Sequence, residues 1–144
     1  MKSIDTIKLL QECDAGSKMA VASIDNMLDK VGSQQLKNVL EESKSHHESL
    51  GNQIHEMLNE REAFEKEPNL IAKGMSRVKT GVKTTMESGD ATIADLITDG
   101  CNMGIKSLYK YLNQYEKAEK NAKEMAEQLI SIEEKLRSDV KEYL

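Results

Sequence analysis

Apolar residues recur along most of the chain at alternating spacings of three and four, the period of one face of an α-helix. The pattern predicts helices over about residues 3–31, 33–64, 69–86, 90–113 and 117–143. Gly32 and Ser33 supply a helix stop and the next N-cap within two residues. So short a connection predicts that the first two helices form an antiparallel hairpin.

The segment 69–86 is shorter than the others and follows Pro68. Its cationic residues are Lys73, Arg77, Lys79 and Lys83. We expect it to pack on an end or flank of the bundle and do not expect it to bind a membrane surface, because it has no Trp or Phe anchor. The whole pattern predicts one all-α domain over residues 1–144, an antiparallel four-helix bundle with an extra short helix before the third long helix.

Composition supports this fold class and narrows the partners. The chain has one proline, no tryptophan and 3% aromatic residues, too few for a β-sandwich. A net charge of −5 gives no reason to bind nucleic acid. The start "MKSIDTIKLL" lacks the apolar region of a signal peptide, and Cys13 and Cys101 form no CxxC pair. We therefore expect a cytoplasmic protein with two buried, reduced thiols.

Polar residues interrupt the apolar face in the middle of the first two helices. They are Asp14 and Ser17 in the first helix, and Ser43 and His47 in the second. Folding the hairpin back about residue 33 brings Asp14 and Ser17 within about two turns of His47. A carboxylate that faces a core needs a charge partner or a metal. We predict a buried polar layer shared by the two helices.

Three interpretations of this layer remain open. It is a structural network that fixes the register of the bundle, or the face is rotated and Asp14 and His47 lie at its wet edge, or it is a metal or catalytic site. His46 is expected at the edge of the apolar face, where Glu42 one turn earlier can pair with it. His55 is expected to be solvated.

Asp95 and Asp99 are one helical turn apart, so they present two carboxylates on one face. That arrangement suits a metal or a basic partner, and exposed acidic residues are the simpler interpretation. Gly100 and Gly104 form a G-x-x-x-G spacing, which favours close helix approach. An apolar-ligand protein would need a cavity beside these glycines.

Three stretches carry a resemblance to a known fold. They are "CDAGSKMAVASIDNML" (13–28), "SHHESLGNQI" (45–54) and "GDATIADLITDGCNMGIKSLYKYL" (89–112). Together with the order of segments, they resemble the ferritin-like superfamily, and within it a family of small uncharacterised bacterial four-helix proteins. The resemblance implies a bundle whose active relatives bind two iron or manganese ions through carboxylates and histidines.

The ligand pattern of those relatives does not carry over to this chain. Their sites use a Glu on two helices and Glu-x-x-His on the other two. Ser43 and Lys44 stand where those glutamates would precede His46 and His47, and the last helix has no histidine. Its glutamates are predicted to lie off the apolar face: Glu124, Glu127 and Glu133. The remaining ligand candidates are Glu12, Asp14, Glu42, His46, His47, Asp95 and Asp99.

These observations predict a non-catalytic helical protein, a homo-oligomer or a binder of another protein, on a ferritin-like scaffold without a complete di-metal site. No cofactor is expected. Methionines assigned to the apolar faces could supply adaptable contact surface: Met19, Met27, Met57, Met75, Met86, Met103 and Met125. The alternative is a metal-binding protein or metal-dependent oxidoreductase, with iron or manganese at a reduced site centred on Asp14 and His47.

Overall fold

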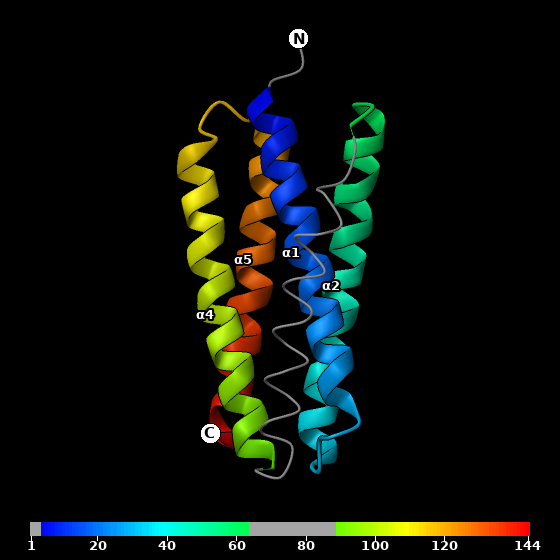
Figure 1. The fold of residues 1–144 in the computed structure, drawn as a ribbon, viewed down its shortest axis with the longest axis vertical. Helices are drawn as coiled ribbons and strands as arrows, with labels where there is room; N and C mark the ends of the chain where they lie inside the picture. Colours follow the sequence, from blue (N-terminus) through cyan, green and yellow to red (C-terminus); the bar gives the residue numbers. More distant parts are fainter. Residues whose placement is uncertain (1–3, 64–88) are drawn as a thin grey trace.

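The computed structural model describes residues 4–63 and 89–144, and this part of the chain is all-helical (Figure 1). Its elements are α1 (Ile4–Leu28), α2 (Gln34–Glu60), α4 (Asp90–Gln114), α5 (Lys120–Val140) and the short 3-10 helix η1 (Lys141–Tyr143). The predicted helix 69–86 lies outside the described residues. Over the same two ranges, no helix combines the length and apolar character that a membrane span requires.

One end of the bundle joins the starts of α1 and α5. The Asp5 carboxylate accepts from the Lys117 backbone N–H at 3.1 Å, and the Thr6 hydroxyl accepts from the Glu119 N–H at 2.8 Å. Arg61, directly after α2, lies 2.6 Å from the Glu119 carboxylate. α1 and α5 therefore begin where α2 ends.

The opposite end joins the starts of α2 and α4. Ser33 is the N-cap of α2, as predicted, and its hydroxyl accepts from the Leu36 N–H at 3.3 Å. Gly89, and not Asp90, is the N-cap of α4. The Asp90 carboxylate instead accepts from the N–H groups of Gly32 and Ser33 at 2.8 and 2.9 Å. Thus α2 and α4 run in the same direction, each antiparallel to its hairpin partner (Figure 1).

Two apolar clusters make up the core, with a polar layer between them. Along α2, the first cluster contains Leu50, Ile54 and Leu58, and the second contains Leu36 and Leu40. Ser43 and His47 lie between these two groups and are buried. The other three helices also pass from one cluster to the other, so the polar residues lie at mid-height in the bundle.

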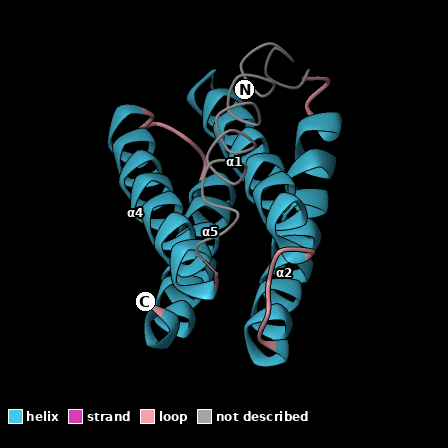
Figure 2. Ribbon diagram, turned by 60° about the horizontal axis from the view of Figure 1, so that its bottom comes forward, coloured by secondary structure: helices cyan, strands magenta, loops and turns pink. Residues whose placement is uncertain are grey.

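α1 packs against α2 and α4 packs against α5, so that the bundle consists of two hairpins (Figure 2). The buried positions of α2 and α5 share a spacing along the sequence. Six of the seven buried positions of α2, all but Leu58, correspond to inward positions of α5 that lie 86 residues later: 36 and 122, 40 and 126, 43 and 129, 47 and 133, 50 and 136, 54 and 140. Asp5 and Asp90, 85 residues apart, each hold the turn of the opposite hairpin. His47 and Glu133 occupy corresponding positions and touch each other.

Candidate functional site

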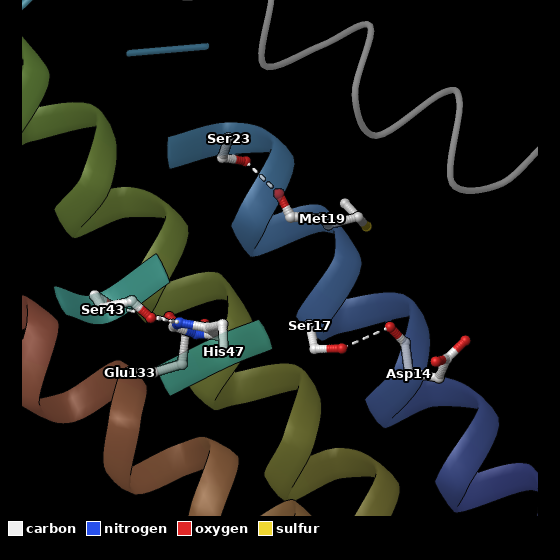
Figure 3. Close-up of polar contacts among 7 residues, drawn as sticks. All are labelled: Asp14, Ser17, Met19, Ser23, Ser43, His47 and Glu133. Atoms are coloured by element: carbon white, nitrogen blue, oxygen red, sulfur yellow. Dashed lines mark hydrogen bonds and ion pairs between the residues drawn. The ribbon is translucent and has the colours of Figure 1, made fainter. Parts of the chain in front are cut away.

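His47 is the centre of the polar layer and is fully buried. Its Nδ1 lies 2.8 Å from the backbone carbonyl oxygen of Ser43 and 3.4 Å from the Ser43 hydroxyl. Its Nε2 lies 3.0 Å from Oε1 of Glu133 on α5 (Figure 3). Both ring nitrogens are therefore engaged by groups of the same chain.

The partners determine where the protons lie. A carbonyl oxygen only accepts, so Nδ1 donates to Ser43. An ionised carboxylate also only accepts, so a proton must lie between Nε2 and Glu133. His47 is either an imidazolium that donates to the Glu133 carboxylate or a neutral ring that accepts from protonated Glu133. In both states neither ring nitrogen has a free lone pair for another ligand.

The position of Glu133 corrects the sequence prediction. Glu133 was predicted to lie off the apolar face, yet its side chain is only 12% exposed and contacts the buried His47. The signal was present, because Glu133 is four residues after Leu129 and three before Leu136, both of which are buried. The neighbouring Ile132 is also partly buried and packs against the core.

α4 completes the surroundings of Glu133. A Cβ at Gly104 would be 3.5 Å from the Glu133 carboxyl carbon, so the absence of a side chain there leaves room for the carboxylate. Burial is the largest cause that raises the pKa of the Cys101 thiol, and the charge of Glu133 and a hydrogen bond to it raise it further. Arg137 acts in the opposite direction. Cys101 is therefore a protonated thiol and a poor nucleophile.

Asp14 is buried, as predicted, with 1% of its surface exposed. The Lys18 ammonium lies 2.9 Å from one carboxylate oxygen, and Nδ1 of His55 lies 4.0 Å from the other. Neither oxygen has an aligned hydrogen bond. His55, expected to be solvated, is half-exposed at 42% and contributes to this second cluster.

The predicted layer therefore consists of two separate clusters. No hydrogen bond or ion pair joins Asp14 to His47 in the described part of the chain, and Figure 3 shows the Asp14 carboxylate on α1 pointing away from the His47–Glu133 pair. Ser17 is buried between these two clusters. Its hydroxyl donates to the Asp14 carbonyl at 2.9 Å and lies 2.9 Å from where a Cβ on Gly51 would be.

The other ligand candidates are dispersed. Glu12 on α1 is partly buried, and Asp95 and Asp99 are exposed on α4. Glu42 and His46 are exposed and line one cleft of about 10 Å³ between α2 and α5. There the Lys135 ammonium lies 3.6 Å from Glu42, in place of the predicted pairing with His46. Within residues 4–63 and 89–144, no three His, Cys, Asp or Glu side chains are grouped as metal ligands.

Among the residues that the structure describes, the paired glycines of α4 border no interior cavity. A Cβ at Gly100 would have no atom within 4 Å, and Gly104 lies against Glu133. Met103 between them was assigned to the apolar face, but it is 70% exposed. Its position corrects that assignment, since this stretch of α4 turns Gly100 and Met103 towards solvent.

Comparisons of the chain with protein-family models, with curated proteins and with solved structures found no match. The resemblance to the ferritin-like superfamily therefore stays a prediction from the motifs.

Proposed function

We propose that this chain is a non-catalytic helical bundle that associates with itself or with another protein, on a ferritin-like scaffold without a complete di-metal site. The observation that carries the proposal is the engagement of both ring nitrogens of His47. A metal at this level would have to displace the Ser43 carbonyl or the Glu133 carboxylate from a fully buried ring.

The ion pair at Asp14 supports the same conclusion. The Lys18 ammonium, 2.9 Å away, supplies the positive charge that a buried carboxylate requires. A metal bound there would lie beside that ammonium and would be repelled by it. The buried charges of both clusters are thus balanced by other side chains of the chain, as in a network that fixes the register of helices.

The ferritin-like part of the proposal is supported by the directions of the helices. α1 and α2 form one hairpin, α4 and α5 form another, and α2 and α4 run the same way. A bundle of this kind needs one long connection between its hairpins, as ferritin-like folds have. In those folds the metals lie in the mid-bundle layer, where this chain has the His47–Glu133 pair.

We also propose a cytoplasmic location. Cys13 and Cys101 are both buried free thiols. Thiols without a partner persist in a reducing compartment. This location is consistent with a protein stabilised by its core and not by disulfides.

Metal analysis tests the proposal against its rival. Untagged protein is purified, incubated with Mn²⁺, Fe²⁺ or Zn²⁺, desalted and analysed by mass spectrometry for metal content. We expect sub-stoichiometric metal that is unchanged in His47→Ala and in the matched surface variant His46→Ala. One metal per chain that is lost in His47→Ala and retained in His46→Ala would establish the metal-binding alternative.

Light scattering on a size-exclusion column, over a range of concentrations, tests association. The proposal predicts a mass that rises with concentration or a stable complex with a protein recovered from cell extract. A monomer at every concentration, with no protein retained on immobilised chain, would contradict it.

A further inference from the structure

The outward face of α4 carries charges in an ordered sequence. Asp95 and Asp99 are exposed in its first half, and Lys106 and Lys110 are exposed in its second half. None of these four makes an ion pair with the described residues. Met103, 70% exposed, lies between the two halves.

We propose that a second copy of this chain docks on this face, forming a symmetric dimer in which the two α4 helices pack antiparallel. In a two-fold dimer, residue i of one copy meets residue j of the other and j meets i. The residue numbers of Asp95 and Lys110 add up to 205, and so do those of Asp99 and Lys106. One two-fold axis between positions 102 and 103 therefore satisfies all four intermolecular ion pairs. This proposal rests on the self-association proposed above and specifies its surface.

Within one copy these charges are unfavourably placed. Asp95 and Asp99 are four residues apart, as are Lys106 and Lys110, so like charges are about 6 Å apart along the helix. All four lie outside the first and last turns of α4, where the helix macrodipole would account for them. An antiparallel second copy places a lysine pair opposite each aspartate pair.

The centre of the face is suited to close helix contact. A Cβ at Gly100 would have no atom within 4 Å, so the backbone is open there. With the axis between 102 and 103, Met103 of the second copy faces position 102, beside Met103 of the first copy, and Gly100 faces position 105. The two flexible thioether side chains can pack against each other at the axis. Burial of two methionines supplies the apolar part of the contact, which the ion pairs alone would lack.

The expected dimer is weak and salt-sensitive. The face from Asp95 to Lys110 is about 22 Å long, which makes an interface smaller than those of permanent dimers. Exposed ion pairs are screened by salt, and each contributes little. We expect the dissociation constant to rise at least about fivefold from low to high salt.

Charge reversal provides a direct test by sedimentation velocity. Variant A carries Lys106→Glu and Lys110→Glu, and variant B carries Asp95→Lys and Asp99→Lys. Each variant alone should lose the homodimer, because its face then has a single sign of charge. An equimolar mixture should regain a dimer of one A with one B. The matched control is Glu41→Lys with Glu48→Lys on α2, which makes the same charge change as variant B and should dimerise like the native chain.

The outcomes separate this surface from self-association in general. If the native chain associates but A and B alone associate equally well, the copies meet on another face, and only the α4 proposal is wrong. If the native chain is monomeric up to millimolar concentration at low salt, no such dimer exists. As a second readout, Met103→Cys should form a disulfide across the axis on mild oxidation and Glu48→Cys should not, since the native thiols are buried. Failure of Met103→Cys to cross-link under conditions where the dimer forms would also refute the two-fold register.

Discussion

The His47–Glu133 pair should dominate the energetics of the polar layer, and the two partners should not be equivalent. Glu133→Leu leaves a fully buried imidazole with one nitrogen unpaired. Removing one partner of a buried pair costs roughly 3–5 kcal/mol. His47→Leu leaves the Glu133 carboxylate, which is 12% exposed and can turn towards water. We therefore expect the free energy of unfolding to fall by about 3 kcal/mol in Glu133→Leu and by about 2 kcal/mol in His47→Leu.

The double variant separates a coupled pair from two independent polar residues. When both partners become apolar groups of similar volume, neither leaves an unpaired atom. His47→Leu with Glu133→Leu should therefore unfold within about 1 kcal/mol of the native chain. Urea denaturation followed by circular dichroism at the helical band measures all four species. With a slope of about 2 kcal/mol per molar urea, Glu133→Leu should lower the midpoint by about 1.5 M.

Glu127→Leu is the matched control, because Glu127 is exposed on the same helix. It should change the free energy of unfolding by less than about 0.5 kcal/mol. A double variant that loses the sum of the two single losses would show that His47 and Glu133 are uncoupled. The reasoning from their contact would then be wrong.

Three further predictions concern other parts of the fold. Asp90→Ala removes both hydrogen bonds to the turn before α2 and should lower the free energy of unfolding by about 1 kcal/mol. Asp90→Asn keeps an acceptor and should lower it by less. Equal losses in the two variants would contradict this role of Asp90. Burial raises the pKa of Cys13 from 9.0 to about 12, and burial followed by Glu12 raises that of Tyr111 from 10.0 to about 12. These raised folded-state values contribute stability that is complete below pH 9 and is lost towards pH 12; the urea midpoint should therefore fall between pH 9 and 11, and a flat profile would refute the assignment. In the native chain, a methyl group at position 51 would displace the Ser17 hydroxyl and its hydrogen bond. Gly51→Ala should therefore raise the free energy of unfolding by about 1 kcal/mol more in a Ser17→Ala background than in the native chain.

Local periodicity was enough to predict the helices and the burial of the polar residues. Whether a residue lies on the inward face of a helix depends on its spacing from apolar neighbours a turn away, and that spacing is present in the sequence. Asp14, Ser17, Ser43 and His47 were assigned to the core in this way, and all four are buried. Ser33 was likewise identified as an N-cap from its own chemistry and its place after Gly32.

The partners of these residues could not be predicted from the sequence, because they depend on how one helix is placed against another. Folding the first hairpin about residue 33 placed Asp14 opposite position 52, whereas the observed contact of Ser17 with Gly51 sets the fold point at position 34. That shift brings Asp14 towards His55. A small change in stagger thus changes which side chains share a turn.

Rotation and distance along the chain account for the rest. Ile132 and Glu133 are both partly buried on α5, and only the packing of α5 against α2 brings Glu133 to His47, 86 residues earlier. The exposure of Met103 was decided in the same way by the rotation of α4. The sequence by itself determined the helices and the polarity of each face, since both arise from neighbours within a few residues. Only the tertiary structure decided which buried charges neutralise one another and which methionine faces solvent, since both depend on the rotation and stagger of helices far apart in the chain.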